Sequence, residues 1–470
     1  MLHAPAVTPI LARFAVEARW DEVPAAARQQ AKRALLNFFA VALAGCRSAP
    51  VEIARKSLAE FSGHGQATVI GRRERTDALS AAFLNAAAAN VLDFCDTHVA
   101  TVIHPTASVA APLFALCELR RVTGAELLLA FVLGVEIECR IGRAISPGHY
   151  AKGWHITSTC GVFGAAIAAG KLMDLDERRT IWALGSAATQ ACGLCECLGW
   201  PAKSIGVGNS ARNGLWSAQL AQHGLEGPPE PIAGVQGFLS AMAEPPNWPA
   251  LIEGLGETWE IEANSIKPYP CGFVIHPVLD CVLDWRRDHP RESIERVIVR
   301  GHPLLSDRTD RPHVTTGSES KVSVQHAVAA ALVTGKAGLD QFSDGCVGDP
   351  AVLAMRRKVE VIRDPAIATV AAAVELWTSD GSKHSLSTSA ARGSPSNPMS
   401  DKDIEDKLRT IAAGWRAGYD AEPLIEAVWA LEESTDVASL LGAQRLTGGG
   451  IAFSTNAAAS LTPPSPSRAA

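Results

Sequence analysis

Roughly the first 250 residues of this chain form a succession of alanine-rich stretches in which apolar residues recur at helical spacing. Strand-like runs do not alternate with these stretches, so a doubly wound α/β fold is not favoured. The stretch at 78–92 is apolar on nearly all sides, which predicts a central, buried helix. The stretches predicted to be helical lie at residues 24–43, 78–92, 124–143, 157–173, 176–189 and 209–223.

Capping residues mark some ends of these helices. Gly45 follows the first long stretch and is predicted to be its C-cap. Thr123 precedes the stretch at 124–143 as a predicted N-cap, and Glu126 lies in the first turn of that helix. The stretch at 157–173 is rich in Ala and Gly, which indicates close packing between helices.

Beyond about residue 266 the pattern changes to a mixture of strands and helices. The run at 296–300 is strand-like, and the runs at 370–377 and 384–388 flank Asp380-Gly381, which predicts a β-hairpin. Pro and Gly residues at 393–398 mark the predicted end of this α+β segment. The remaining predicted helices lie at 274–287 and 323–335 within the segment and at 401–412 and 422–431 after it.

The chain is therefore predicted to be mainly α, with a large helical domain and a smaller α+β domain. A length of 470 residues fits two domains. The last residues are rich in Gly, Ser and Pro, which predicts a disordered tail. The predicted boundaries are 1–266 for the first part of the helical domain, 267–398 for the α+β domain, 399–446 for the C-terminal part of the helical domain, and 447–470 for the tail.

Charge and cysteine usage exclude several classes of protein. A net charge of −6 gives no electrostatic footprint for nucleic acid or an anionic membrane. The apolar runs are shorter than the ~18 residues that a membrane-spanning helix needs. The 11 cysteines show no disulfide spacing and no signal peptide is evident, so a reduced, cytoplasmic location is expected.

Chemically competent residues gather in a few segments. Two segments carry histidines, at 93–104 and 148–155, and two carry lysines, Lys203 and Lys267. Together they supply proton carriers and fixed cations. The CxxCxC spacing at 192–197 has no second cysteine pair, and the glycines at 206–208 lack the lysine of a phosphate loop, so neither a metal nor a nucleotide is predicted. This combination fits an enzyme that moves protons on an anionic substrate without a cofactor.

The sequence resembles the MmgE/PrpD family from about residue 27 to residue 441. That family includes 2-methylcitrate dehydratase, cis-aconitate decarboxylase and iminodisuccinate epimerase. No single motif is decisive, but their shared order along the chain is specific. The motifs that carry the resemblance are Leu92-Asp93-Phe94-Cys95-Asp96-Thr97, His104-Pro105, Gly153-Trp154-His155, Lys203 with Gly208-Asn209-Ser210, Lys267-Pro268-Tyr269-Pro270-Cys271, and Gly393-Ser394-Pro395.

The resemblance implies an all-helical domain built from both ends of the chain, with the α+β segment inserted as a lid. It also implies a homodimer, an active site between the helical domain and the lid, no cofactor, and a small polycarboxylate substrate. The shared chemical step is the removal or delivery of a proton at a carbon next to a carboxylate. The family positions that match in this sequence are Asp93, Thr97, His104, His155, Lys203 and Lys267.

These residue types suggest a division of roles. His104 and His155 are candidate acids and bases, because histidine titrates nearest to neutral pH, and Asp93 is expected to orient His104. Lys203 and Lys267 are expected to hold carboxylates and to stabilise developing charge. Three further candidates are Thr97 as a hydrogen-bond donor to a substrate carboxylate, Arg212 as an additional cation, and Tyr150 as an acid or anion donor.

The sequence departs from the family at a few of these positions. Gly272 stands where cis-aconitate decarboxylases carry a histidine, Ser306 falls near their lid tyrosine, and Cys95 replaces a carboxylate. These departures count against cis-aconitate decarboxylation, which stays as an alternative. Dehydration of a 2-methylcitrate-like hydroxy acid is expected as the default activity of the family. Epimerisation of an imino- or amino-dicarboxylate is the next alternative, because of the local similarity around Tyr150. A different class, a catalytically inactive dimeric scaffold, predicts that the named residues do not converge.

Overall fold

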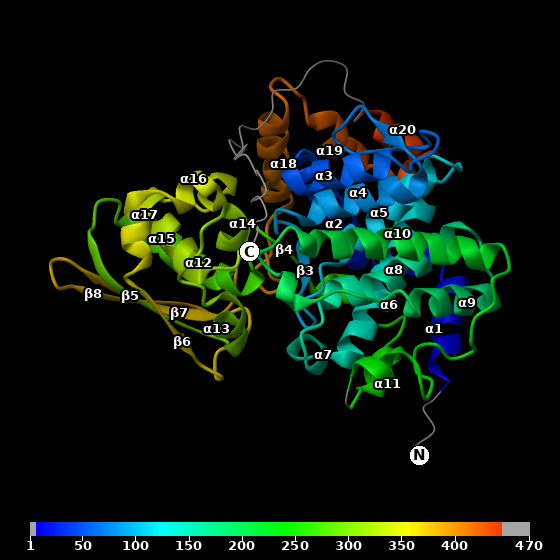
Figure 1. Cartoon of the computed structure of the whole chain (residues 1–470), viewed down its shortest axis with the longest axis horizontal. Coiled ribbons are helices and arrows are strands. Elements are labelled where there is room, and N and C mark those ends of the chain that lie inside the picture. The colour runs from blue at the N-terminus through cyan, green and yellow to red at the C-terminus, as the bar shows by residue number, and fades with distance from the viewer. Residues whose placement is uncertain (1–5, 244, 444–470) are drawn as a thin grey trace, which may run out of the picture.

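A computed structural model describes residues 6–243 and 245–443, so the predicted tail lies outside the described residues. The chain is mainly α, as predicted. It has a large helical part and a smaller part that contains a sheet (Figure 1). The helices of the larger part are α1 (Val7–Glu17), α2 (Ala25–Gly45), α3 (Ala49–Ala59), α4 (Ala78–Asn90), α5 (Pro105–Cys117), α6 (Gly124–Ile145), α7 (Gly148–Ala151), α8 (Ile156–Leu172), α9 (Glu177–Ala188), α10 (Ala202–Gln222), α11 (Phe238–Met242), α18 (Asp401–Trp415), α19 (Glu422–Trp429) and α20 (Ala438–Ala443).

The helical part has one continuous apolar core to which both ends of the chain contribute. Phe38 and Phe39 of α2 are buried in it, and so are Leu408 and Trp415 of α18. In Figure 1, α18 and α19 lie beside the N-terminal helices α2 to α4. The predicted helices at 401–412 and 422–431 therefore belong with the first 250 residues in space.

The predicted capping of α6 is confirmed, but that of α2 is wrong. The hydroxyl of Thr123 accepts a hydrogen bond from the Glu126 backbone N–H, and the Glu126 carboxylate in turn accepts one from the Thr123 N–H. Gly45 is the last residue of α2 rather than its C-cap, because Cys46 caps the helix in an ordinary helical conformation. A side chain at Gly45 would clash with the Ala88 carbonyl of α4, so this glycine permits a close helix approach.

Close approach also joins α8 and α10. A methyl group at Gly214 of α10 would clash with the Ala165 side chain and the Val162 carbonyl of α8. The small residues predicted at 157–173 therefore pack as expected. Helix α10 begins at Ala202, well before the predicted start at 209, and this places Lys203 in its first turn.

The smaller part is built around a four-stranded sheet with the order β6–β5–β7–β8. Strand β5 runs parallel to β6 and antiparallel to β7, and β7 and β8 form the predicted hairpin, with Gly381 at positive φ in its turn. Helices α12 and α15 share an apolar core with the sheet. The elements of this part are β5 (Ile294–Gly301), β6 (Val359–Arg363), β7 (Ala372–Thr378), β8 (Lys383–Thr388), α12 (His276–Asp288), α13 (Pro303–Thr309), α14 (Gly317–Ser320), α15 (Val324–Thr334), α16 (Asp344–Val347) and α17 (Pro350–Arg356).

A short antiparallel ribbon marks the junction of the two parts. Strand β3 (Asp96–His98) pairs with β4 (Asn264–Ile266), which brings two segments far apart in sequence side by side (Figure 1). Gly393, at positive φ, accepts a hydrogen bond from the Ile266 N–H, and a side chain at Gly393 would clash with the Ile266 carbonyl. Another pair of short strands, β1 (Ala67–Thr68) and β2 (Arg75–Thr76), lies in the helical part.

Within the described residues, no single helix is both long and apolar enough to cross a bilayer. Helices α2 and α3 pass this test of length and composition only as a pair, across a bend of 82°.

Candidate active site

A pocket lies at the junction of the helical part and the sheet-containing part. Seven of the eight residues predicted to form the site line it, and Arg212 does not. The residues that line the pocket are Asp93, Thr97, Val102, His104, Tyr150, His155, Leu198, Lys203, Lys267, Gly272, Phe273, Val274, Leu304, Arg308, Thr309 and Val322.

Three helices point their N-termini at this pocket. His104 is the residue before α5, His155 is the residue before α8, and Lys203 lies in the first turn of α10. A helix N-terminus carries partial positive charge and backbone N–H groups without intrahelical partners. The backbone therefore adds to the lysines in favouring an anionic ligand.

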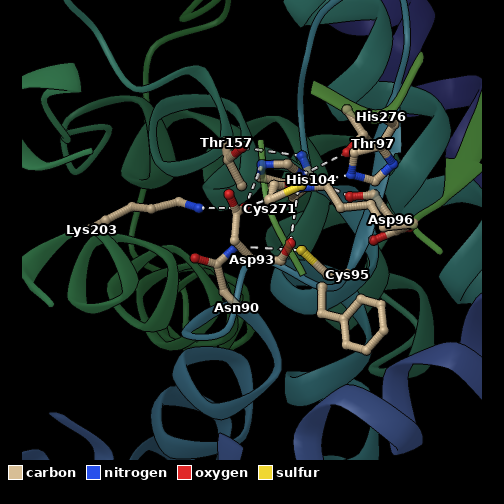
Figure 2. Close-up of polar contacts among 12 residues, drawn as sticks. Asn90, Asp93, Cys95, Asp96, Thr97, His104, Thr157, Lys203, Cys271 and His276 are labelled. Carbon is tan, nitrogen blue, oxygen red and sulfur yellow. Dashed lines mark hydrogen bonds and ion pairs between the residues drawn. The ribbon is translucent and has the colours of Figure 1, made fainter. Parts of the chain in front are cut away.

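The carboxylate of Asp93 joins the two predicted lysines. Its Oδ1 atom lies 2.9 Å from Nζ of Lys203 and 2.9 Å from Nζ of Lys267; Figure 2 shows the Lys203 contact. Asp93 has φ of 54°, an uncommon conformation that aims this buried side chain at both ammonium groups. Although burial opposes ionisation, the two lysines hold the pKa of Asp93 well below its usual value.

His104 is held by the ribbon strand β3. Its Nδ1 lies 2.7 Å from the Asp96 carbonyl oxygen and 3.0 Å from the Thr97 hydroxyl (Figure 2). A carbonyl oxygen only accepts, so Nδ1 carries the proton and donates it, and Nε2 of the neutral ring is a free base. Burial, together with Lys267 and Lys203, lowers the pKa of His104 well below its usual value.

This geometry corrects two predicted roles. Nε2 of His104 lies 3.8 Å from the Asp93 carboxylate, which is beyond hydrogen-bond distance, so Asp96 and Thr97 orient the ring instead of Asp93. The Thr97 hydroxyl, predicted to bind a substrate carboxylate, contacts the His104 ring.

His155 and Tyr150 complete the set of proton carriers. His155 Nδ1 lies 2.7 Å from the Ser158 hydroxyl, and burial lowers the pKa of this histidine to about 3. Burial raises the pKa of the Tyr150 phenol above its ordinary value, so the phenol stays protonated at neutral pH. Burial therefore favours the neutral form of both imidazoles, while Tyr150 retains its proton.

A buried lysine outside the pocket stabilises the backbone of the pocket wall. Lys407 of α18 donates hydrogen bonds to the backbone carbonyls of Phe94 and Lys267, at 2.8 and 2.9 Å, and to the Asn37 side chain. Its ammonium also lies 3.5 Å from the centre of the Phe94 ring. Lys407 thus holds the backbone next to Asp93 and at Lys267, although its own side chain does not line the pocket.

The prediction for Arg212 is wrong. Its guanidinium lies over the ring of Phe83 and donates to the side chains of Asn209 and Asn213 on its own helix. Arg212 projects from a different side of α10 than Lys203, and only Lys203 faces the pocket.

Sequence reasoning missed two cations near the pocket, Arg308 and Lys321. Arg308 lines the pocket from α13, and its guanidinium lies 4.6 Å from the Tyr150 ring. Lys321 precedes the pocket residue Val322, and burial lowers the pKa of its ammonium to about 8 while Asp93 opposes this shift. A lone Arg or Lys in a helical segment is usually solvated, so no sequence signal marked either residue.

The positions that depart from the family add no charged group to the pocket. A methyl group at Gly272 would be in ordinary contact with the Thr309 and Ile275 side chains and the Lys321 carbonyl, at 3.6 to 3.7 Å. Ser306 does not line the pocket, because its hydroxyl donates to the Pro303 carbonyl within α13. Cys95 is buried, and burial raises the pKa of its thiol to about 11, so it is neutral beside Lys267.

In the ranges 6–243 and 245–443, no three His, Cys, Asp or Glu side chains are grouped so as to hold a metal ion. Of the CxxCxC cysteines, Cys192 is exposed whereas Cys195 is buried, and Cys195 donates to the Trp154 carbonyl.

The fold and the pocket together define a class: a mainly helical protein whose histidines, lysines and tyrosine converge on one pocket beside a sheet-containing part. Comparison with known sequences gives the family. The MmgE/PrpD N-terminal domain matches residues 10–250, and the MmgE/PrpD C-terminal domain matches residues 269–433. The chain belongs to the MmgE/PrpD family, as its motifs predicted.

Several curated relatives match along nearly their whole length. Cis-aconitate decarboxylase of Aspergillus terreus is 28% identical, and the match covers 93% of this chain and 95% of the relative. Cis-aconitate decarboxylase of Mus musculus is 26% identical, with 88% of each chain covered. The enzyme of the same name from Homo sapiens is also 26% identical, over 88% of this chain and 89% of the relative.

Proposed function

We propose that this protein is a lyase that removes carbon dioxide from a small unsaturated tricarboxylate of the cis-aconitate type. The observation that carries the proposal is the convergence of Lys203, Lys267, His104, His155 and Tyr150 on one pocket. A catalytically inactive scaffold gives no reason for such convergence. The names of the relatives favour decarboxylation over the dehydration that the sequence motifs suggested.

The pocket suits the charge changes of this reaction. When the carbon–carbon bond to one carboxylate breaks, carbon dioxide leaves and the electron pair passes through the double bond to a carbon next to another carboxylate. Fixed cations and helix N-termini stabilise that extra charge in a buried site. Lys203 and Lys267 are the proposed cations, and Asp93 holds both in place.

A proton must then reach the carbon that receives the electron pair. The Tyr150 phenol is protonated and is one proposed donor. Burial lowers the pKa of His104 and of His155. A substrate carboxylate beside an imidazole raises its pKa, so either ring can take up a proton with the substrate and deliver it. A positioned donor contributes about 10²–10⁴ in rate.

Dehydration stays as a second candidate because of Gly272. Gly272 lines the pocket where cis-aconitate decarboxylases carry a histidine, and the lack of that imidazole suits a substrate of a different shape. In dehydration or epimerisation the free Nε2 of His104 would remove a proton from carbon.

One experiment separates these reactions. Purified protein is incubated with cis-aconitate, 2-methylcitrate and an amino-dicarboxylate, and the products are analysed by mass spectrometry. We expect loss of carbon dioxide from cis-aconitate. Loss of water from 2-methylcitrate, or exchange of a carbon-bound hydrogen for deuterium without a mass loss, would replace decarboxylation with dehydration or epimerisation.

Variants connect the activity to the pocket. Tyr150→Phe, His104→Ala and His155→Ala should identify the proton donor through a loss of about 10²–10⁴ in kcat. His223→Ala, at an exposed histidine at the end of α10, is the matched control and should retain full activity. Turnover by all three pocket variants at the rate of the control would remove these residues from the mechanism.

We further propose that the sheet-containing part acts as a lid over the pocket, and that the chain works as a homodimer in the cytoplasm. Movement of the lid is expected because the pocket lies between the two parts and takes residues from both. Analytical ultracentrifugation would test the dimer, and a monomer at micromolar concentration would contradict it.

A further inference from the structure

Arg308 contributes a positive charge to the pocket from the sheet-containing part. It lies on α13, whereas Lys203 and Asp93 belong to the helical part. Its Nη2 atom donates to the Tyr150 backbone carbonyl at 2.7 Å, and its guanidinium lies over the Tyr150 ring. Arg308 therefore spans the boundary between the two parts of the molecule.

Among the residues that the structure describes, Arg308 forms no ion pair, in contrast to the two lysines. Lys203 and Lys267 both bond to the Asp93 carboxylate. The described contacts of the Arg308 guanidinium are with a carbonyl oxygen and an aromatic ring, and neither of these carries a formal charge. An anion that enters the pocket would thus find Arg308 without a competing carboxylate.

The Arg308 side chain also has a donor that is not used. Its Nε atom is buried and has no hydrogen-bond partner among the described residues. A buried N–H without an acceptor is costly, and such a group in a pocket indicates that a ligand supplies the acceptor. The planar guanidinium matches a carboxylate with two parallel hydrogen bonds, which a lysine cannot form.

We propose that Arg308 binds a carboxylate that the reaction leaves on the substrate, and that it thereby selects tricarboxylates over dicarboxylates. The inference rests on the proposed polycarboxylate function, and it assigns to Arg308 a specificity role that the two lysines cannot fill. Because Arg308 lies on α13, the substrate would be held from both parts of the molecule at once.

Calorimetric binding to saturated ligands tests this without turnover. Tricarballylate carries three carboxylates, whereas glutarate lacks the central one and methylsuccinate lacks a terminal one. The wild-type protein should prefer tricarballylate. The affinity of Arg308→Met for tricarballylate should be about 10- to 100-fold lower than that of the wild type, the range for a lost charged hydrogen bond. The affinity of the variant for at least one of the two dicarboxylates should stay nearly unchanged.

Two further variants separate recognition from folding. Arg308→Lys keeps the charge but loses the paired donors, so it should retain only part of the preference. Arg311→Met is the matched control, because Arg311 also donates to a backbone carbonyl of the helical part, that of Leu198, at 2.9 Å but does not line the pocket. Its preference for tricarballylate should equal that of the wild type.

Each outcome is decisive. Equal weakening of all three ligands in Arg308→Met, or an unchanged preference, would overturn the role of Arg308 and leave the proposed function standing. Wild-type protein that binds none of the three would overturn the polycarboxylate function and this inference with it. If Arg308→Met loses the preference for tricarballylate and the wild type releases no carbon dioxide from cis-aconitate, the role of Arg308 in recognition would be supported and decarboxylation would be refuted.

Discussion

Asp93 is the residue on which the charge balance of the pocket depends. A single carboxylate oxygen accepts from two lysines, and one of them, Lys267, is almost fully buried. Lys267 also donates to the Cys271 carbonyl, so its position links the helical part to the start of the sheet-containing part. Although burial opposes it, Asp93 raises the pKa of Lys267 above its usual value.

Asp93→Asn should therefore cost both activity and stability. The substitution leaves two ammonium groups close together without a counter-charge, and breaking a buried pair in this way costs about 3–5 kcal/mol. We expect kcat/KM to fall at least about 100-fold and the Tm to fall as well, measured by steady-state kinetics and differential scanning calorimetry. Asp21→Asn, which breaks the exposed pair with Arg19, is the control and should change neither.

At this scale the motifs predicted which residues meet but not how they bond. Asp93, His104 and Lys267 come together as the family resemblance implied. The sequence could not show that Asp93 would pair with lysines, because hydrogen-bond partners depend on side-chain directions that the fold sets. Arg308 carried no motif, so only its place on the pocket wall revealed it.

At the scale of elements, α10 depends on its contact with α8. Its first turn carries Lys203, and Gly214 further along lets the two helices approach. A displacement of α10 would therefore move Lys203 relative to the other residues of the pocket. Helix α8 is linked to the site in the same way, because His155 precedes its first residue.

Gly214→Ala should destabilise the protein and reduce its activity. The new methyl group would clash with Ala165 and the Val162 carbonyl, and overpacking of this kind costs about 1–3 kcal/mol. We expect a lower Tm and a lower kcat, since the helices must separate. Gly442→Ala in α20 is the control, because a methyl group there meets no atom of the described residues within 4 Å. A Tm for Gly214→Ala equal to that of the control would show that α10 does not need this glycine.

Apolar spacing predicted α2, α4, α6, α8 and α9 along most of their length, but it left α1, α3 and α5 unpredicted. It also missed the part of α10 before residue 209, where Ala202, Lys203 and Ser204 show no apolar periodicity. It also missed β3 and β4, since a strand of three residues is too short to carry an alternating pattern. The start of α10 and the strands β3 and β4 are the unpredicted elements that bring Lys203, Thr97 and Lys267 into the pocket.

At the scale of the whole molecule, buried neutral histidines link folding to pH. Burial lowers the pKa of His155 and of His276 to about 3, from 6.5. Between these values the unfolded chain binds more protons than the folded one. Their contribution to stability is therefore complete above about pH 6.5 and is lost as the pH falls towards about 3.

His276→Gln isolates this effect. Its amide nitrogen lies at the same distance along the side chain as Nε2 of His276, so it can still donate to the Cys271 carbonyl, as Nε2 does at 3.3 Å, but it cannot take up a proton. We expect the Tm of the wild type to fall more than that of the variant between about pH 7 and about pH 5. Calorimetry across this range measures the difference. Parallel curves for the two proteins would mean that His276 is not held neutral in the fold.

The change of pattern near residue 266 predicted a two-part chain, but not how its last helices return to the first. Lys407 of α18 contributes to this contact, because it donates hydrogen bonds to the backbone carbonyls of Phe94 and Lys267. Every residue of the pocket wall precedes residue 323, yet the wall is braced by a side chain made much later in synthesis. A nascent chain on the ribosome would thus hold all of its reacting groups and still lack a working catalyst until α18 emerged and docked.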